Sequence, residues 1–285
     1  MQQLEIELKT PEQIGLMRRA GLVVANTLAV LRDAVAPGVT TAELDRIAEE
    51  SIRSTGAIPS FKGYHGYPAS ICSSVNDQVV HAIPSARQVL REGDLVSIDC
   101  GAELDGWHGD AAVTVGVGEV RSDLLRMITV AEDAMWSGIA AAARGLRSGR
   151  GRLTDISFAI QSTVRKAGRY GIVDGYGGHG IGSAMHQDPF VLNAGRPGKG
   201  PSLVAGMGLA IEPMITKGKP RVAELDDGWT VVTVDGSTAV HVEHSIALCD
   251  DGGVWVLTAL DGGRSRLGDL ITAREDSKPY GYTRN

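Results

Sequence analysis

Apolar residues at helical spacing predict the first two helices of the chain. The first stripe consists of Ile14, Met17, Val24, Leu28 and Leu31. Thr10 and Gln13 have the spacing of a capping box just before this stripe, so a helix is expected from about residue 11 to a Pro-Gly pair. Thr40 and Glu43 repeat the box for a second helix, which a glycine should end near residue 56.

A second pair of helices follows further along the chain, and strands surround it. Ser122 is expected to cap the third helix, and Thr154 or Asp155 the fourth. The segments with strand character cover residues 69–75, 95–100, 108–117, 208–215, 230–234, 240–248 and 254–257. Several are bounded by Asp-Gly or Gly-Gly, which favours hairpins. Two helices followed by strands, twice over, predict an α+β domain built from two related halves.

The two halves also share short motifs. His81 and His186 each begin an H-x-x-P sequence. In each half a glycine then leads an apolar strand to a carboxylate, at Asp99 in GDLVSID and at Glu212 in GMGLAIE. A second carboxylate follows on a later strand of each half. The same features in the same order indicate an internal repeat.

Asp99 and Asp110 flank a predicted hairpin turn. A turn centred on residues 104–105 would place them directly opposite each other, whereas a turn on 105–106 would make them diagonal neighbours. Either register leaves both side chains on one face. Two adjacent carboxylates repel unless a cation lies between them or one is protonated, so half of a metal site is indicated. The pair alone leaves open a second interpretation, two solvated acids beside a turn.

Two further acids lie in similar settings. Glu212 ends a buried apolar run before a proline, where an unpaired carboxylate would be costly to desolvate. Alternation in HVEHSIAL puts Glu243 on the same face as His241. By itself Glu243 is also compatible with a surface position on an edge strand.

The stretch GYGGHGIGSAMHQDP contains His179 and His186. Its start fits G-x-G-x-x-G, but no helical apolar pattern follows the last glycine, which disfavours a dinucleotide site. The glycines instead allow close backbone approach and would fix the imidazole of His179. For His186 a turn histidine satisfied by backbone is the alternative.

Taken together, these residues form a candidate metal centre. The set is rich in oxygen and has one nitrogen, which suits a pair of first-row divalent ions such as cobalt, manganese, iron or zinc. Two ions about 3.5–4 Å apart can share a hydroxide and polarise a carbonyl, which is hydrolytic chemistry. His81 and His186 would donate hydrogen bonds to the tetrahedral oxyanion. The ligands are Asp99, Asp110, His179, Glu212 and Glu243.

Composition and charge limit the partners and the cellular compartment that we expect for the protein. A net charge of -6 argues against a nucleic-acid partner, and three widely spaced cysteines suit a reducing compartment. The N-terminus lacks the pattern of a signal peptide, and no apolar run approaches the ~20 residues that span a bilayer. We therefore expect a cytoplasmic protein without membrane association.

Several longer stretches resemble the methionine aminopeptidases of the pita-bread fold. They are GYHGYPASIC, VNDQVVHAIP, SIDCGAELDGWHGDAAV, GGHGIGSAMHQDP, AIEPM and DGWTV followed by VEHSIAL. The resemblance runs from about residue 10 to 260 and implies two pseudo-symmetric halves around a curved antiparallel sheet. A single metallo-aminopeptidase domain is then expected over residues 1–285, with 264–285 a polar tail that is loosely ordered or packed on the surface.

The resemblance also implies a role for each site residue. Asp99 would be bidentate on one ion, Asp110 and Glu243 would bridge, and His179 and Glu212 would hold the other ion. Glu212 would also help to move the proton of the water. His81 would contact the scissile amide or the new amine, and His186 the carbonyl oxygen. A methionine pocket would be formed by Tyr64, Tyr67, Cys72, Met185 and Trp229, although ordinary core packing would account for the same cluster.

The implied reaction is removal of the N-terminal methionine from nascent proteins and peptides when the second residue is small. The short interval between Glu212 and Glu243 indicates the type I enzymes. Val80, Ala82, Phe61 and Met185 depart from the usual family residues and bear on substrate fit rather than on the ligands. The family suggests a monomer that associates transiently with the ribosome.

Two other functions compete with this one. A proline-specific aminopeptidase or dipeptidase would share the fold, but such relatives carry an additional N-terminal domain, for which we expect no room before Thr10. A metal-free binding protein would typically have lost ligands, and all five are present here.

Overall fold

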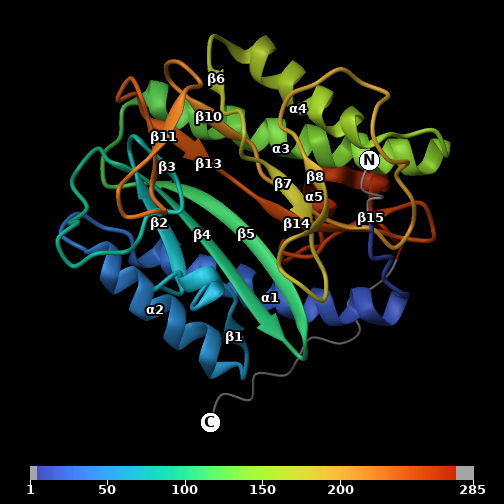
Figure 1. Ribbon diagram of the computed structural model, residues 1–285, viewed down its shortest axis with the longest axis horizontal. Helices are drawn as coiled ribbons and strands as arrows, with labels where there is room; N and C mark the ends of the chain where they lie inside the picture. The colour runs from blue at the N-terminus through green and yellow to red at the C-terminus, as the bar shows by residue number, and fades with distance from the viewer. Residues whose placement is uncertain (1–4, 274–285) are drawn as a thin grey trace.

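Both predicted capping boxes are present in the computed structural model, which describes residues 5–273 (Figure 1). Helix α1 spans Pro11–Ala34, and the Gln13 amide donates to the Thr10 hydroxyl at 3.3 Å. Helix α2 spans Thr41–Ser54, with the reciprocal bonds between Thr40 and Glu43 at 2.8 and 3.2 Å. The first helix pair is therefore confirmed, as is its capping.

The second helix pair is also present, but the expected N-cap positions are wrong. Helix α3 spans Ser122–Ser148, so Ser122 is its first helical residue, not its cap. Helix α4 spans Leu153–Ala167. Its N-cap is Arg152, and Asp155 caps from inside the helix, where its carboxylate accepts the Arg152 amide at 2.8 Å. The Thr154 hydroxyl and the Asp155 carboxylate each accept a backbone N–H from residues 198–199 at 2.8 Å. These side chains anchor a distant loop, a tertiary role that helix spacing cannot indicate.

The first half forms a four-stranded antiparallel sheet. It contains β1 (Ile58–Pro59), β2 (Ile71–Val75), β4 (Leu95–Leu104) and β5 (Trp107–Gly116). Strand β4 lies between β1 and β2 and also pairs with β5. Helices α1 and α2 pack on this sheet and enclose one core. Its fully buried members include Leu31, Leu44, Ile52, Ile71, Val96 and Ile98.

The second half has its own core beneath α3 and α4. Its main sheet has the order β15-β14-β9-β7-β8. The strands are β7 (Gly178–Gly180), β8 (Gln187–Val191), β9 (Gly208–Ile211), β14 (His244–Leu248) and β15 (Val254–Val256). Two three-stranded sheets complete the fold, and one of them includes a strand from the first half. They contain β6 (Gly171–Ile172), β10 (Met214–Thr216) and β13 (Ala239–His241), and β3 (Gln78–Val80), β11 (Val222–Glu224) and β12 (Val231–Thr233).

Two expected strands are interrupted. The segment 208–215 breaks into β9 and β10 at Glu212-Pro213, and 240–248 breaks into β13 and β14 at residues 242–243. Residues before and after the breaks pair in different sheets, since His244 pairs with Ile211 whereas His241 pairs with Met214. Both segments therefore pass, at the same place, between the five-stranded sheet and the three-stranded sheet that contains β10 and β13. A glutamate lies at each break.

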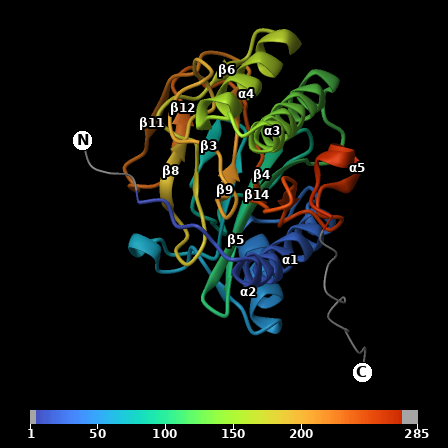
Figure 2. The ribbon, with the colours of Figure 1, turned by 90° about the vertical axis from the view of Figure 1, so that its right-hand side faces the viewer.

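The two halves meet in an antiparallel arrangement with the helices on one side. Figure 2 shows α1, α2 and α3 on the same side of strands β3, β8, β11 and β12.

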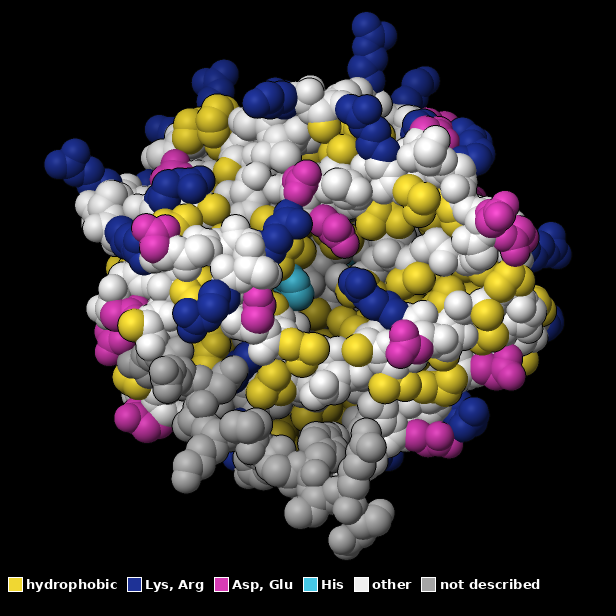
Figure 3. Space-filling view, turned by 180° about the vertical axis from the view of Figure 1, so that it is seen from behind, with side chains coloured by type: hydrophobic (Ala, Val, Ile, Leu, Met, Phe, Trp, Pro, Cys, Tyr) yellow, Lys and Arg dark blue, Asp and Glu magenta, His cyan; other side chains and the backbone are white. Residues whose placement is uncertain are grey.

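On the face seen in Figure 3, basic and acidic side chains are interspersed. Among the described residues, α1 is long and apolar enough to cross a membrane by length and composition, with mean hydropathy 1.4. It packs here as a core helix against β4 and β5.

The described part of the expected polar tail packs on the fold. It contains the short helix α5 (Arg264–Leu267) and a 3-10 turn over Gly268–Leu270. Leu267 is buried, and Ile271 pairs with Val254. The remainder of the expected tail, residues 274–285, lies outside the described residues.

Candidate metal centre

The β4–β5 hairpin presents Asp99 and Asp110 side by side. Asp99 pairs with Ala112, and Gly101 with Asp110, so the two acids are diagonal neighbours on one face. The turn that sets this register consists of Asp105 and Gly106, with φ of 53° and 79°. Two successive positive φ values match a two-residue hairpin turn. Of the two registers that the sequence left open, the structure has the tighter one.

Glu243 reaches the same place from the second half. Its amide donates to the carbonyl of Ala112 at 2.9 Å, which joins the crossing segment to the outer edge of β5. Two residues later the Ser245 hydroxyl donates to the Asp110 carbonyl at 2.7 Å and accepts from the Asp110 amide at 3.0 Å. This junction between the halves, from Ala112–Glu243 to Asp110–Ser245, is called the seam below.

His179 lies on β7, between two glycines. A Cβ atom on Gly178 would lie 2.1 Å from the carbonyl oxygen of Ala210, so only glycine allows this approach to β9. The His179 Nδ1 contacts the Gly180 carbonyl at 2.9 Å, and its Nε2 lies 3.6 Å from Glu212 Oε1 and 4.0 Å from Asp110 Oδ2. The glycines thus serve a histidine on a strand, and no helix follows them to form a phosphate site.

His241 is a residue that sequence analysis placed on the face of Glu243 without giving it a role. It is 2% exposed, and its Nε2 lies 3.3 Å from Glu212 Oε2 and 4.0 Å from Glu243 Oε2. The available signal was the H-x-E spacing, which puts both side chains on one face of an extended segment.

The four carboxylates are buried at 9% exposure or less. Burial raises the pKa of Asp99 to about 7, and burial also raises the pKa values of Asp110, Glu212 and Glu243 well above the usual range. The ion pairs that these residues form within residues 5–273 are all with histidines. One buried oxygen atom each of Asp99, Asp110 and Glu243 has no hydrogen-bond partner. Buried acids without donors are costly, and divalent cations would satisfy them.

The donor set fits metal ions in detail. Asp110, His179 and Glu243 offer donor atoms within 4.8 Å of one another, as do Glu212, His241 and Glu243. A ring N–H that points to a carbonyl, as at His179, leaves Nε2 with its lone pair towards the carboxylates. That arrangement is repulsive without a cation and favourable with one.

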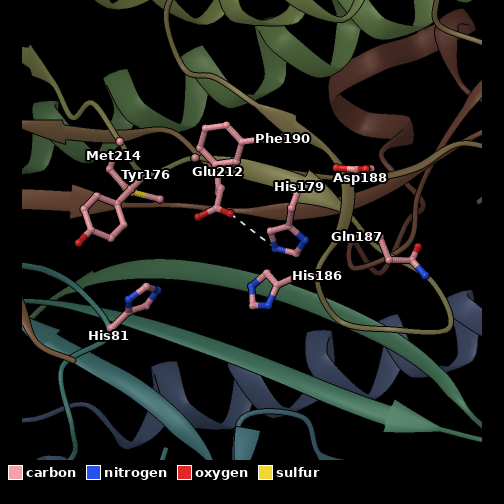
Figure 4. Close-up of a pocket in the computed structure, with 11 residues that line it drawn as sticks. His81, Tyr176, His179, His186, Gln187, Asp188, Phe190, Glu212 and Met214 are labelled. Atoms are coloured by element: carbon pink, nitrogen blue, oxygen red, sulfur yellow. Dashed lines mark ion pairs between the residues drawn. The ribbon is translucent and has the colours of Figure 1, made fainter. Parts of the chain in front are cut away.

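His81 and His186 flank this cluster (Figure 4). Their rings lie on the same side of the Glu212–His179 pair. His81 follows β3 with a φ of 60°, a strained backbone that over-determined sites tolerate. Burial lowers the pKa of His81 to about 4, so its imidazole is neutral near pH 7. His186 Nδ1 lies 2.9 Å from the Tyr64 hydroxyl, and its ring centre is 4.3 Å from that of His179.

An apolar cluster adjoins the acids. Cys72 pairs with Asp99 across β2 and β4, which fixes the distance between cluster and acids. The Tyr67 hydroxyl donates to the carbonyls of Ile71 and Ala82 at 3.0 and 3.1 Å, and its ring packs edge-on against Trp229. The structure thus brings together all five residues expected to form a pocket. The complete cluster is Phe61, Tyr64, Tyr67, Ala69, Cys72, Ile83, Met185 and Trp229.

Comparison with known proteins agrees with this geometry. The model of metallopeptidase family M24 matches residues 15–249. The chain belongs to this family. Methionine aminopeptidase 1 of Mycobacterium tuberculosis is 55% identical to this M24 chain over 245 residues, which cover 84% of this chain and 90% of that protein. The methionine aminopeptidase of Clostridium acetobutylicum is 51% identical over 247 residues, 87% of this chain and 96% of that protein.

A solved structure extends the comparison to the M24 fold. The methionine aminopeptidase from Rickettsia prowazekii superposes with a TM-score of 0.85 at 40% identity, covering 90% of this chain and 100% of that one. The predicted family and pita-bread fold are therefore confirmed, and the chain is a metallopeptidase whose clustered carboxylates and histidines can bind metal.

Proposed function

We propose that this protein hydrolyses the N-terminal methionine from nascent proteins and peptides, preferably when the second residue is small, with water activated by two divalent ions. The observation that carries the proposal is the cluster of buried, unpartnered carboxylate oxygens beside a cluster of apolar side chains. The 55% identity to methionine aminopeptidase 1 of Mycobacterium tuberculosis supports the same activity. Neither proline-specific hydrolysis nor a metal-free binding role is favoured.

The ligands would be the five residues expected from the sequence. Asp99, Asp110 and Glu243 would hold one ion, and His179 and Glu212 would complete the other with the two bridging acids. Two bound ions would polarise the scissile carbonyl and acidify a water molecule. Cobalt, manganese, iron and zinc all accept such a ligand set.

The remaining groups would bind and orient the substrate. When the Tyr64 hydroxyl donates to His186 Nδ1, the proton of the neutral imidazole is on Nε2, and this N–H can donate to the carbonyl oxygen of the substrate. His81, neutral near pH 7, can contact the scissile amide or the new amine. The carboxylate of Glu212 can accept the proton of the attacking water. The apolar cluster around Met185, Cys72 and Trp229 would receive the methionine side chain.

We also propose that the whole chain acts as one metallo-aminopeptidase domain, because the candidate ligands come from both halves. We propose a cytoplasmic monomer that meets nascent chains through transient ribosome association; its three free cysteines are in keeping with a reducing compartment.

The test uses chelator-stripped protein titrated with manganese or cobalt. Free amino acids would be measured after incubation with Met-Gly-Met-Met and, separately, with Ala-Pro-Met-Met. We expect metal-dependent release of methionine from the first peptide alone. Release from the second peptide instead would move the protein to the proline-specific branch. No release from either peptide, with metal bound, would refute peptidase activity on these substrates.

A further inference from the structure

We propose that Glu7 and Lys9, which precede the first helix, are positioning residues for His186, because they fix the loop that carries it. The loop consists of residues 182–187 and is called the His186 loop below. It joins β7, which holds His179, to β8. The inference rests on the proposed function, in which the His186 ring donates to the substrate carbonyl.

Burial by itself holds the His186 loop weakly. Ser183, Ala184 and His186 are exposed, whereas Met185 is buried in the apolar cluster. A side chain that must meet a reacting atom at a defined distance needs a backbone that is fixed. The backbone of an exposed loop is fixed by hydrogen bonds when packing does not supply the restraint.

Side chains of the N-terminal segment provide these hydrogen bonds. The Glu7 carboxylate accepts from the Ser183 hydroxyl at 2.6 Å, from the Ser183 amide at 3.2 Å and from the Gln187 side-chain amide at 2.8 Å. The Lys9 ammonium donates to the Gln187 side-chain oxygen at 3.0 Å and lies 3.3 Å from the Glu7 carboxylate. Residues near both ends of the loop are therefore bound to the same ion pair.

Lys9 makes its contacts from a buried position. Its side chain is 1% exposed, and burial lowers the pKa of its ammonium below the usual range. An apolar side chain of similar length would fill this space without the cost of desolvating a charge. The stem of Lys9 lies against Gly182, where a Cβ atom would collide with the Lys9 Cε. The buried charge is thus placed at the start of the His186 loop and bonded to its end.

The N-terminal segment is attached to the strand that leads to a proposed metal ligand. The Lys9 amide donates to the Gly206 carbonyl at 2.8 Å, and Leu8 forms a bridge with Met207. These residues directly precede β9, and Glu212 follows that strand. Glu7 and Lys9 therefore fix the His186 loop relative to the strand of a candidate ligand.

The loop separates the two tasks between neighbouring residues. Figure 4 shows the His186 ring beside His179 and Glu212, whereas the Gln187 side chain points away from them. Gln187 also begins β8 and pairs with Gly180, next to His179. A shift of Gln187 would consequently move the backbone of His186 relative to the metal centre.

The experiment measures kcat and KM for Met-Gly-Met-Met in full-length protein loaded with manganese. Lys9→Met is made in wild type and in His186→Ala. Lys217→Met is the matched control, since Lys217 forms an ion pair with Asp123 at 2.9 Å and has no contact with the His186 loop. Ser183→Ala is a second variant at an exposed position, where folding does not depend on the side chain.

We expect Lys9→Met to lower kcat about 10-fold in wild type, with KM and bound metal nearly unchanged, because a displaced His186 loses a contact made in the transition state. In His186→Ala the same change should lower kcat less than about 2-fold, since there is no ring left to position. Ser183→Ala should lower kcat about 3-fold in wild type, and Lys217→Met should leave it unchanged.

Equal losses of kcat from Lys9→Met in both backgrounds would overturn the proposal, because Lys9 would then act without His186. A rise in KM with unchanged kcat would also overturn it and assign Lys9 to the apolar cluster. Wild-type kcat in both Lys9→Met and Ser183→Ala would refute any part of Glu7 and Lys9 in the reaction.

Hydrogen exchange of the amides of residues 183–187, followed by mass spectrometry, separates this proposal from the proposed function. It needs no activity and should be faster in Lys9→Met than in wild type or Lys217→Met. Unchanged exchange with an active wild type would refute the positioning role alone. Faster exchange with a wild type that releases no methionine would retain the hold on the loop and refute the proposed function.

Discussion

The seam gives a prediction with an internal control, because two buried serines differ only in their partners. Ser245 and Ser73 are both 0% exposed. The Ser245 hydroxyl satisfies both the amide and the carbonyl of Asp110, whereas the Ser73 hydroxyl has no hydrogen-bond partner. Replacing each serine by alanine removes the same hydroxyl group from two sites that are equally buried.

The expected cost follows from what each change leaves behind. Ser245→Ala leaves the amide and the carbonyl of Asp110 without their hydrogen-bond partner, and Asp110 is only 3% exposed. A buried polar group left without a partner costs about 1–3 kcal/mol, so the free energy of unfolding should fall by about 2–4 kcal/mol. Ser73→Ala removes a hydroxyl that is already unsatisfied, and its effect should be within about 0.5 kcal/mol or slightly stabilising.

The assay is urea unfolding of metal-free protein, followed by circular dichroism with chelator present. Equal slopes against urea for wild type and both variants would show that the same surface is exposed, so the midpoints can be compared directly. Equal losses of stability in Ser245→Ala and Ser73→Ala would refute the reasoning, because partners would then be irrelevant. A Ser245→Ala variant as stable as wild type would refute it as well.

Three further predictions concern the site and its surroundings. His186→Ala should lower kcat about 100-fold on Met-Gly-Met-Met, as loss of one oxyanion donor does, with metal content unchanged; a parallel fall in bound metal would reassign His186. Asp110→Asn should weaken binding of both ions in metal titrations, and full two-ion occupancy at limiting metal would contradict a bridging role. Burial raises the pKa of Glu7, but hydrogen bonds from Ser183 and Gln187 outweigh it and hold the pKa at about 2, against 4.5 when free. The stability that Glu7 adds is therefore complete above pH 4.5 and is lost as pH falls through the folded pKa of about 2. The melting temperatures of wild type and Glu7→Gln should differ at pH 6, differ less at pH 3 and converge near pH 2; a constant difference would disprove this.

Features encoded within a few residues could be predicted from the sequence. The capping boxes at Thr10 and Thr40 depend on a partner three residues away, and both formed as expected. The facing of Asp99 and Asp110 depends only on strand alternation, which is why it held for either register. The turn itself was decided by Asp105 and Gly106, which both adopt positive φ.

Features that depend on distant partners could not be predicted. The start of α4 was misplaced because Asp155 caps the helix from its third position and not as the N-cap, while Thr154 binds a loop more than forty residues away. The strand breaks beside Glu212 and Glu243 arise from a change of sheet, and alternation continues through them unaltered. The environment of His241 depends on Glu212, 29 residues earlier, and on the β4–β5 hairpin, so spacing alone gave it no role.

The proposed ligands come from both halves, which has a consequence for cutting the chain in two. Asp99 and Asp110 precede the connection between β5 and α3, whereas His179, Glu212 and Glu243 follow it. A chain cut between residues 117 and 121 would give two pieces, each with its own core and only part of the proposed ligand set. When mixed, the two pieces would be active only after they associate. Activity would rise with the concentration of either piece. It would also require metal, because the ions would be bound by residues of both pieces.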